Sequence, residues 1–592
     1  MTDKPGSTLN KGLKKGLTSY GDSGFSLFLR KAFIKAMGYT DDALDRPIIG
    51  ITNTFSDFNP CHGYVPQIIE AVKRGVMQEG GMPFVFPTIS IGESFAHPTS
   101  MYLRNLMALD TEEMMRAQPV DAVVLIGGCD KTIPAQLMAA ASLDIPSIII
   151  PTGPMLTGEH KGERLGACTD CRRFWAKYRA GEIDQAEIDE VNAKLAPTTG
   201  TCMVMGTAST IACMVEAAGM SLPGAAAIPA VYAERFRHAE TTGRRVVALT
   251  KTPLLPKQIL TPKSVTNALI VLHAIGGSTN ALIHFTAVAA RLGISIDLDA
   301  FDQLGRNIPV LVDLKPSGAH YMEHLYEDGG LMAVLKELKP MLHLDCMTIS
   351  GRTLGEEIDA AKVPVTRKVI RLAQSPIFPV GGLAVLKGNL APRGAIIKHS
   401  SATPALLKHR GRAVVFTSIE DLASRIDSDD LDVAADDVLV LQNIGPKGAP
   451  GMPEAGYIPI PKKLAKAGVK DMVRMSDARM SGTAFGTIVL HIAPEAAEGG
   501  PFAAVRNGDM ISLDVSARTL TLEISDAEMA ARLKTWTPPP TLANMPNHGY
   551  RKLYQTSVTQ ADIGCDFDFM LPEMNQTAPI IAAGEKAGVK HA

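Results

Sequence analysis

Three cysteines occupy loops that lead into predicted helices. Cys61 lies in the sequence NPCHG, Cys129 in LIGGCDKT and Cys202 in GTCMVMGTAST. Such loops gather at the carboxyl edge of an open α/β sheet, so thiols far apart in the sequence can meet there. Thiolates are soft ligands that suit iron, whereas a single buried cysteine is more often a small core residue. The sequence therefore allows an iron site at this edge without proving it.

Carboxylates in similar loops add a second kind of ligand. Asp130 follows Cys129 directly and precedes Lys131. Glu93 lies in the sequence IGESF, and Glu454 lies in GPKGAPGMPE. Hard oxygen ligands suit Mg²⁺, so a site that combines thiolates and carboxylates would hold two different Lewis acids. Taken singly, each of these carboxylates is more often a solvated surface charge.

The elements that must position these residues are those of a parallel sheet covered by helices. Short β-branched runs alternate with helical patterns over the first two-thirds of the chain, which is typical of repeated βαβ units. In one of the helices, Ile68, Ile69, Val72 and Val76 form an apolar face. The predicted strands are 47–52, a run through Val85, 122–126 and 147–150, and the predicted helices are 65–78 and 132–141.

A change of character near Val380 predicts a second domain. Helical patterns become rare beyond it, and Gly-punctuated apolar runs such as GLAVLKG, GAIIKHS and GRAVVFTS follow one another. This pattern is typical of a β-rich, barrel-like domain. We therefore expect an α/β fold, with an N-terminal parallel-sheet α/β domain at residues 1–378 and a C-terminal barrel-like domain at 379–592. The tail after Thr535 is expected to wrap over a neighbouring domain or subunit.

Composition argues against several classes of function. Lys and Arg number 59 against 61 Asp and Glu, so the net charge of -2 provides no field for nucleic acid or an anionic membrane. No run of about 18 apolar residues occurs, and the N-terminal sequence lacks the apolar core of a signal peptide. Eight cysteines in 592 residues are too sparse for a disulfide scaffold. We expect a cytoplasmic protein that binds neither nucleic acid nor a membrane.

Eight motifs in a fixed order carry a resemblance to a known family. From about Arg46 to Asp568 the chain resembles the dihydroxy-acid and sugar-acid dehydratases. This resemblance implies a hydro-lyase that eliminates water from a 2,3-dihydroxy acid to give a 2-keto-3-deoxy acid. It also implies a homodimer or homotetramer that acts on a small molecule. The motifs are NPCHG, GGCDKT, GTCMVMGTAST, GGSTNALIH, LKGNLAPRGAIIK, GPKGAPGMPE, DARMSGTA and APEAAEGGP.

An iron–sulfur cluster is implied by the same resemblance. By motif position, Cys61, Cys129 and Cys202 would hold a [2Fe–2S] cluster. Three thiolates can also hold a [4Fe–4S] cluster with one open iron, which is the alternative. A set of only three cysteines leaves an iron position free for the hydroxyl group that departs.

Mg²⁺ is the second implied cofactor. By motif position, Glu93, Asp130 and Glu454 would bind it, and Lys131 falls where some family members carry a carbamoylated lysine that adds an oxygen ligand. Mg²⁺ bound to the carboxylate and C2 hydroxyl of the substrate would stabilise the charge that develops as the C2 proton leaves.

A serine is the implied catalytic base. Ser481 in DARMSGTA matches the family's base, Thr483 lies close to it, and Lys131 is the next candidate for this role. A serine is a poor base unless a metal and nearby cations favour its alkoxide. Because Glu454 and Ser481 fall in the second predicted domain and the cysteines in the first, the site must form where the domains meet.

Two conspicuous motifs are set aside. Cys168 and Cys171 form the sequence CTDC, which alone would indicate a redox pair or half of a zinc site. No second pair completes a four-cysteine site, and the resembled family does not use this segment. The sequence GGST at 276–279 resembles a phosphate-binding turn without its lysine, so we expect a helix N-terminus that holds the substrate carboxylate.

The substrate is indicated by the segment HPTSMYLRNL at 97–106. It resembles the sugar-acid branch, which implies L-arabinonate, D-xylonate or D-gluconate as substrate. Arg104 and Asn105 are expected to donate hydrogen bonds to the polyol tail; the alternative is a structural role, with Arg104 tied to an acidic neighbour on its own helix. The alternative within the family is 2,3-dihydroxyisovalerate, a precursor in branched-chain amino-acid biosynthesis. The alternatives from other classes are an iron–sulfur redox sensor and a thiol–disulfide enzyme that uses Cys168 and Cys171.

Overall fold

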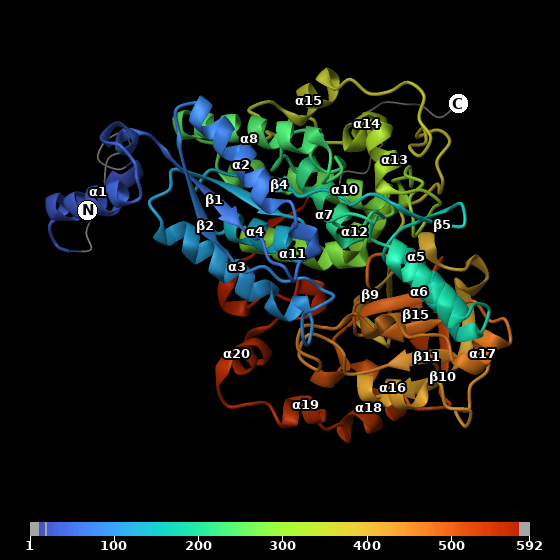
Figure 1. The fold of residues 1–592 in the computed structure, drawn as a ribbon. Helices are drawn as coiled ribbons and strands as arrows, with labels where there is room; N and C mark the ends of the chain where they lie inside the picture. Colours follow the sequence, from blue (N-terminus) through green and yellow to red (C-terminus); the bar gives the residue numbers. More distant parts are fainter. Residues whose placement is uncertain (1–10, 18–19, 579–592) are drawn as a thin grey trace, which may run out of the picture.

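The computed structural model describes residues 11–17 and 20–578, and it confirms the mixed α/β architecture expected from the sequence (Figure 1). The N-terminal part contains a four-stranded parallel sheet in the order β2-β1-β3-β4. Every strand lies within two or three residues of its predicted position, because near-continuous apolar runs are typical of strands buried on both faces. The strands are β1 Ile48–Asn53, β2 Met82–Pro87, β3 Ala122–Gly127 and β4 Ser147–Pro151.

The strand order reverses at β1. Since β2 lies on one side of β1 and β3 on the other, the connections after β1 and β3 leave the sheet in opposite directions. Such a reversal opens a crevice outside the carboxyl ends of the two strands, which is where open α/β sheets bind ligands. The loops with Cys61 and Cys129 begin at this crevice.

Two predicted helices have the bounds expected from their apolar periodicity. They are α2, Val65–Gln78, and α4, Thr132–Ala141. The apolar face of α2 is buried, and the helix crosses α8, Ala233–Lys251, at close range. A Cβ atom at Gly75 would lie 2.0 Å from the backbone oxygen of Glu240, so this crossing requires glycine. Every residue of α4 is buried, so this helix lies inside the N-terminal part of the molecule.

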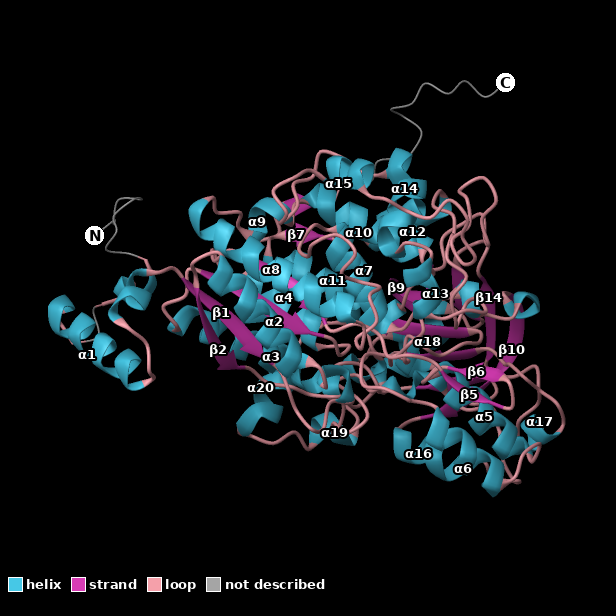
Figure 2. Cartoon of the chain, turned by 45° about the horizontal axis from the view of Figure 1, so that its top comes forward, coloured by secondary structure: helices cyan, strands magenta, loops and turns pink. Residues whose placement is uncertain are grey.

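The other elements of the N-terminal part are mostly helices that surround α4 and the sheet (Figure 2). They are α1 Ser23–Ala36, α3 Ser100–Ala117, β5 Gly158–His160, β6 Glu163–Leu165, α5 Thr169–Ala180, α6 Gln185–Lys194, α7 Thr207–Ala217, α9 Pro256–Ile259, α10 Pro262–Ala274, α11 Thr279–Arg291, β7 Ile294–Ser295, α12 Leu298–Arg306, α13 Met322–Glu327, α14 Gly330–Leu338 and α15 Leu354–Ala360.

A closed eight-stranded barrel forms the second part and confirms the expected β-rich architecture. Its strand order is β10-β11-β12-β13-β9-β8-β15-β14, with parallel pairs from β10 to β13 and antiparallel pairs elsewhere except for β15 with β8. The strands are β8 Ala384–Gly388, β9 Ala391–Ile397, β10 Lys408–Phe416, β11 Val438–Leu441, β12 Arg474–Ser476, β13 Ile488–Ala493, β14 Met510–Asp514 and β15 Thr519–Leu522. Helices α16 Ile419–Arg425 and α17 Lys462–Lys466 lie in connections between strands.

The chain after the barrel returns to the N-terminal part. Arg291 at the end of α11 forms buried ion pairs with Asp566 of this tail, at 2.7 Å, and with Glu112 of α3, at 3.0 Å. The tail therefore fastens the barrel to the first part of the chain, as the red segment beneath α3 in Figure 1 also shows. Its elements are α18 Asp526–Lys534, α19 Pro540–Ala543, α20 Gly549–Ser557 and β16 Gln576–Thr577, which pairs with β7.

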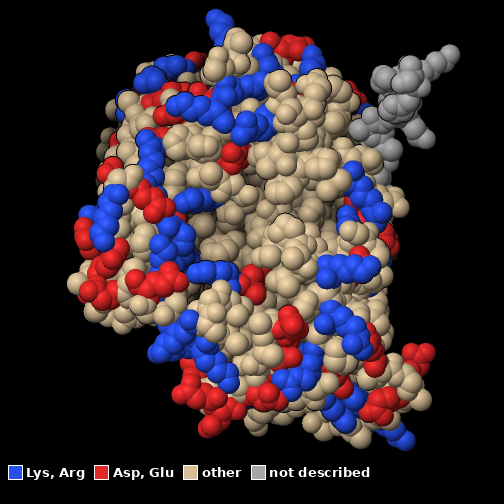
Figure 3. Space-filling model, turned by 90° about the vertical axis from the view of Figure 1, so that its right-hand side faces the viewer, with Lys and Arg blue, Asp and Glu red and all other residues tan. Residues whose placement is uncertain are grey.

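The surface carries charges of both signs. On the face shown in Figure 3, Lys and Arg side chains are interspersed with Asp and Glu around a hollowed area of uncharged residues. Exposed ion pairs, such as that of Arg410 with Glu523, occur on the surface of the molecule. Among the described residues, no helix is both long enough and apolar enough to cross a membrane.

The ion pairs of Arg291 give a stability prediction. Asp566→Ala leaves a fully buried guanidinium with Glu112 as its only carboxylate partner, which is expected to lower the free energy of unfolding by about 3–5 kcal/mol. The matched control is Arg410→Ala in the exposed pair with Glu523, for which we expect about 1 kcal/mol or less. Urea unfolding of the full chain measures both values, and equal effects would contradict the role of the tail.

Candidate active site

A fully buried lysine lies among three carboxylates from both parts of the chain. Lys131 Nζ is 2.9 Å from Glu93 Oε2, 3.6 Å from Asp130 Oδ2 and 3.8 Å from Glu454 Oε1. Asp130 and Lys131 follow β3 directly and begin α4, and Glu93 lies in the loop after β2. Glu454 begins the 3-10 turn Glu454–Tyr457 between β11 and β12 of the barrel. The structure thus brings together the four residues that the resemblance associates with Mg²⁺.

Neighbouring side chains hold these carboxylates in place. Thr99 Oγ1 donates to Glu93 at 2.7 Å, and Ser100 Oγ donates to its other oxygen. Glu454 Oε1 accepts from Arg479 Nη1 at 3.1 Å and from Asn280 Nδ2 at 3.2 Å. Arg479 and Asn280 lie inside the motifs DARMSGTA and GGSTNALIH, but the sequence alone did not single them out. Glu454 lies 174 residues from Asn280 and 25 residues from Arg479 in the sequence, so neither contact is local.

Burial and neighbouring charges shift the pKa values of the three carboxylates around Lys131. Burial raises the pKa of Asp130 and of Glu454, and the nearby Glu93 raises that of Glu454 further. Burial also opposes ionisation of Glu93, but the charges of Lys131 and Arg479 outweigh it and hold the pKa of Glu93 below its usual range. Lys131 Nζ is enclosed and has no well-directed hydrogen bond, despite its short distance to Glu93. Three partly buried carboxylates therefore lie around the buried Lys131 side chain, which supplies a positive charge among them.

Four thiols lie in two neighbouring pairs. Cys61 stands in the 3-10 turn Pro60–His62 after β1, and a hydrogen bond to the Cys129 thiol together with burial raises its pKa well above the ordinary value. Cys168 Sγ lies 3.7 Å from Cys202 Sγ. Cys168, which the sequence analysis set aside, thus adds a fourth sulfur to the three in the predicted set. Three other thiols, those of Cys213, Cys346 and Cys565, are buried in the core.

His62 fastens the loops that carry Cys61 and Cys129. Its Nε2 accepts hydrogen bonds from the backbone N–H groups of Gly128, at 3.0 Å, and Cys129, at 3.2 Å. Its Nδ1 lies 2.7 Å from the carbonyl oxygen of Thr54, to which it donates when the ring is neutral. Burial lowers the pKa of His62 to about 4, so the neutral ring is the form present near neutral pH. This histidine therefore orients the backbone of the neighbouring Cys129 loop.

The loop that carries Ser481 docks onto the start of α5. Ser481 Oγ is 2.8 Å from Thr483 Oγ1, which also accepts from Arg172 Nη1 at 3.0 Å. Thr169 Oγ1 donates to the carbonyl oxygen of Thr483 at 2.8 Å. Since Thr169 follows Cys168 directly, the serine loop and the thiol pair are fixed by the same turn of helix.

The GGST segment lies against the same serine loop. Ser278 is the N-cap of α11 and accepts from the N–H of Asn280. A Cβ atom at Gly482 would lie 2.5 Å from Ser278 Oγ and 2.7 Å from the backbone nitrogen of Thr207, at the N-terminus of α7. Two helix N-termini therefore meet the loop of Ser481, and their partial positive charge favours an anion nearby.

The expectation that Arg104 and Asn105 face the substrate is wrong. Both side chains are almost fully buried. Arg104 Nη2 donates to the carbonyl oxygens of Gly564 and Cys565, at 2.9 and 2.8 Å, and Asn105 Nδ2 donates to that of Cys565 at 2.9 Å. The two residues bind the returning C-terminal tail, whose carbonyl groups are far away in the sequence and could not be foreseen from it.

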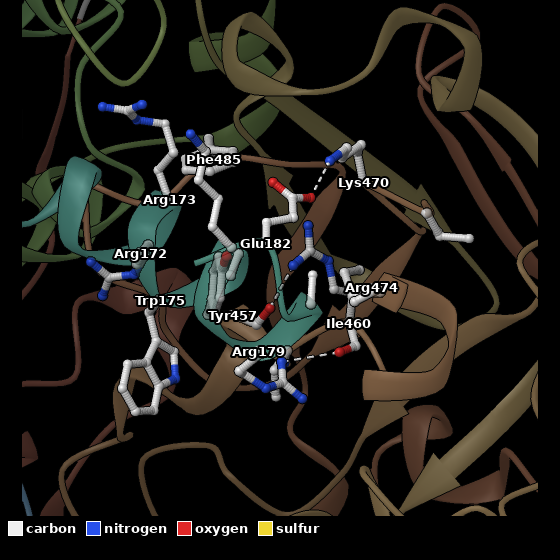
Figure 4. A pocket seen from close by; sticks show the side chains of 16 residues that line it. Arg172, Arg173, Trp175, Arg179, Glu182, Tyr457, Ile460, Lys470, Arg474 and Phe485 are labelled. Atoms are coloured by element: carbon white, nitrogen blue, oxygen red, sulfur yellow. Dashed lines mark hydrogen bonds and ion pairs between the residues drawn. The ribbon is translucent and has the colours of Figure 1, made fainter. Parts of the chain in front are cut away.

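Two cavities flank helix α5. The larger one, of about 600 Å³, reaches the thiols, because Cys168, Cys171 and Arg172 line it together with α6, Tyr457 and Pro459. The smaller one, of about 230 Å³, lies between α5 and the barrel (Figure 4). In it Arg179, Arg474 and Lys470 are bonded to Ile460 O, Tyr457 O and Glu182. The larger cavity is therefore the better candidate for access to the site.

Comparison with known proteins agrees with this arrangement of thiols and carboxylates. Models of the dihydroxy-acid/6-phosphogluconate dehydratase family match the chain in two parts, the N-terminal model at residues 46–357 and the C-terminal model at 368–565. The chain belongs to this family. It is a dehydratase, an enzyme of the hydro-lyase class.

Among its relatives, this dehydratase is similar to enzymes named for sugar acids. It is 48% identical to the L-arabinonate dehydratase of Rhizobium leguminosarum bv. trifolii (strain WSM2304), over 93% of this chain and 95% of that protein. It is 44% identical to the 6-deoxy-6-sulfo-D-gluconate dehydratase of Pseudomonas putida, over 90% and 91%. The dihydroxy-acid dehydratase of Acetivibrio thermocellus is 40% identical, over 90% and 96%. The dehydratase thus falls with the sugar-acid branch.

The contacts of His62 give a prediction for the thiol loops. His62→Leu removes the acceptor of two buried N–H groups, so the free energy of unfolding is expected to fall by about 1–3 kcal/mol for each group left unpaired. The control is His548→Leu at an exposed position. Urea unfolding and the rate of thiol alkylation at Cys129 measure the effect. Unchanged stability together with unchanged alkylation would show that His62 does not hold this loop.

Proposed function

We propose that this dehydratase converts sugar acids such as L-arabinonate, D-xylonate and D-gluconate to 2-keto-3-deoxy acids. In this proposal Cys61, Cys129 and Cys202 hold a [2Fe–2S] cluster. Mg²⁺ is bound by Glu93, Asp130, Glu454 and a carbamoylated Lys131. The observation that carries the proposal is the meeting of soft thiols, hard carboxylates and the serine loop at one crevice between the sheet and the barrel.

The donor sets fit the two proposed metals. Carboxylate oxygens suit Mg²⁺ and thiolates suit iron. As an ammonium group, Lys131 supplies the positive charge among the carboxylates. A carbamoylated Lys131 would be anionic, and the resulting four anionic groups would require a divalent cation. Among the described residues, no three ligating side chains surround a single ion position. Thiols in pairs are consistent with this finding, because a two-iron cluster divides its ligands between two metals.

The proposed chemistry assigns the C2 proton to Ser481. When bound, the cluster and Mg²⁺ would supply Lewis acidity at the departing C3 hydroxyl and at the substrate carboxylate. Arg172 donates to Thr483 Oγ1, which leaves the Thr483 hydroxyl free to donate to Ser481 Oγ. Ser481 Oγ is then the final acceptor in this series of hydrogen bonds. The two helix N-termini next to the loop favour its anionic form. These contacts prepare Ser481 to accept a proton.

Substrate choice rests on the relatives and on the larger cavity. Enzymes named for L-arabinonate and for a sulfogluconate are 48% and 44% identical to this chain. The cavity offers Arg172 and Asn192 as hydrogen-bond donors for a polyol, in place of the buried Arg104 and Asn105. The second candidate substrate is 2,3-dihydroxyisovalerate, which the 40% identical dihydroxy-acid dehydratase favours.

The wider setting belongs to the same proposal. We propose a cytoplasmic homodimer or homotetramer whose domains divide at residues 378 and 379, with a small molecule as its only substrate and no nucleic-acid or membrane partner. Helix α1 supports self-association, because it projects from the molecule in Figures 1 and 2. Phe25, Phe28 and Phe33 on it are 47%, 66% and 70% exposed, and such aromatic exposure is typical of contact surfaces. Eight free thiols suit a reducing compartment.

The ligand set predicts how cysteine variants behave. Cys61→Ser, Cys129→Ser and Cys202→Ser are each expected to lose the bound iron, because a hydroxyl is a poor ligand for a soft metal site. The matched control is Cys213→Ser, which removes a buried thiol of the core. Iron content and absorbance of anaerobically purified protein measure the effect. Full iron retention in any one of the first three variants would remove that cysteine from the set.

The proposed role of Ser481 as catalytic base predicts how a variant without its hydroxyl behaves. Ser481→Ala is expected to keep iron, Mg²⁺ and fold while kcat falls by about 10²–10⁴, because only the proton acceptor is removed. Thr483→Ser is the companion variant that retains the hydroxyl next to Ser481. Both are assayed by keto-acid formation from L-arabinonate. Near-normal kcat in iron-replete Ser481→Ala would assign the base elsewhere, with Lys131 the next candidate.

A substrate panel tests the proposed function directly. L-arabinonate, D-xylonate, D-gluconate and 2,3-dihydroxyisovalerate are assayed on one anaerobic preparation, with an arm from which divalent cations have been removed. We expect kcat/KM to favour a sugar acid over dihydroxyisovalerate by at least about tenfold, as hydrogen-bonding pockets reject analogues that leave donors unpaired. The arm without Mg²⁺ should be inactive but still coloured. A preference for dihydroxyisovalerate would overturn the substrate assignment.

A further inference from the structure

The fourth sulfur at the thiol site comes from a segment that the proposed ligand set does not use. Cys168 is the N-cap of α5, and its Sγ lies 3.7 Å from that of Cys202. Its carbonyl oxygen accepts from Arg172 Nη1 at 3.1 Å and from the Cys171 thiol at 2.6 Å. The next residue, Thr169, is bonded to the serine loop. The backbone on both sides of this sulfur is therefore fixed by contacts.

The spacing of the two sulfurs is that of two ligands on one metal. Thiolates about 2.3 Å from a tetrahedral metal lie roughly 3.7–3.8 Å from each other. Cys168 and Cys202 have this separation, and Cys61 and Cys129 form a second pair linked by a thiol hydrogen bond. Four cysteines, two for each iron, are the usual ligand set of a [2Fe–2S] cluster. The chain thus provides one more thiol than a substrate-binding cluster requires.

We propose that Cys168 is a fourth, exchangeable thiolate ligand of the cluster, which occupies the open iron position until the substrate hydroxyl displaces it. This inference rests on the proposed function. On binding, the Cys168 thiol would lose its proton to solvent. On displacement by the substrate oxygen, the released thiolate would take a proton back from solvent. No electron is transferred in either direction. The resting centre is closed by four thiolates, and only the substrate opens it.

The surroundings of Cys168 suit a ligand that leaves and returns. Cys168 lies at a helix terminus, is partly exposed and lines the cavity of about 600 Å³, so the substrate and the thiol share one space. Cys129, by comparison, is 3% exposed and sits behind the loops that His62 fastens. Cys171 lines the same cavity, is also partly exposed, and points its thiol at the Cys168 carbonyl. It is therefore a matched control for access to the cavity.

Alkylation of Cys168 tests the proposal without an activity assay. The full chain is treated anaerobically with iodoacetamide in three states, namely without iron, with the cluster, and with the cluster plus saturating L-arabinonate, and mass spectrometry quantifies each cysteine. Cluster loading is expected to slow alkylation of Cys168 by roughly tenfold or more, because a metal-bound thiolate is no longer a free nucleophile. L-arabinonate should restore the rate. Cys171 reports access to the cavity in each state, so the rate at Cys168 is read relative to the rate at Cys171.

Spectra of variants supply the second readout. Cys168→Ser should retain the cluster but shift the electron paramagnetic resonance spectrum of the reduced protein, and the wild type with L-arabinonate should shift in the same direction. Cys171→Ser should match the wild type. Equal alkylation of Cys168 with and without the cluster would overturn the proposal, even if Cys168→Ser fails to fold. Wild-type protein that dehydrates sugar acids without iron would instead overturn the proposed function.

Discussion

The burial of Lys131 among three carboxylates is the constraint on which the rest of the site depends. An unpaired ammonium group at this buried position would cost several kcal/mol. Carboxylates from both the sheet loops and the barrel are therefore needed around Lys131. Glu93 and Asp130 come from the loops of the sheet and Glu454 comes from the barrel. Neither part alone completes the arrangement. These ion pairs therefore hold the sheet loops and the barrel together at the site.

The topology explains why this position lies next to the thiols. The strand order reverses between β1 and β3, and the loops after these two strands carry Cys61 and Cys129 with its neighbours. Because the Cys129 loop continues directly into Asp130 and Lys131, one turn supplies both a thiol and a carboxylate. Helix α5 closes the crevice from the other side, with Cys168 next to Cys202 and Thr169 on the serine loop. Thiol, carboxylate and hydroxyl side chains from distant segments therefore lie near one another.

Features with a local signal could be predicted from the sequence. The bounds of α2 and α4 follow from apolar periodicity, and the barrel follows from its Gly-punctuated runs. The three-residue strand β12 has too few residues to show such a pattern. Arg104 was misread because its partners are carbonyl groups of the tail, more than 400 residues away. Distant backbone partners leave no trace in local sequence. Arg479 bonds Glu454 from a separate loop of the barrel, which the motif that contains Arg479 does not encode.

The position of Cys168 next to Cys202 could not be predicted from sequence motifs. Family motifs indicated three cysteines, and the CTDC motif was set aside because its spacing suggested other chemistry. The contact of Cys168 with Cys202 depends on how α5 docks against the serine loop, which no pattern within the CTDC segment encodes. The missed signal was simply the presence of a fourth cysteine in a loop that precedes a helix, as in the other three.

The central claim is that thiols and carboxylates from both parts of the chain hold two different metals side by side. Anomalous diffraction from crystals of the anaerobically purified full chain, collected on both sides of the iron absorption edge, tests it most directly. The account predicts iron signal enclosed by Cys61, Cys129 and Cys202, and a separate density without an iron signal among Glu93, Asp130 and Glu454. Iron among the carboxylates, or none between the thiols of an active preparation, would contradict it.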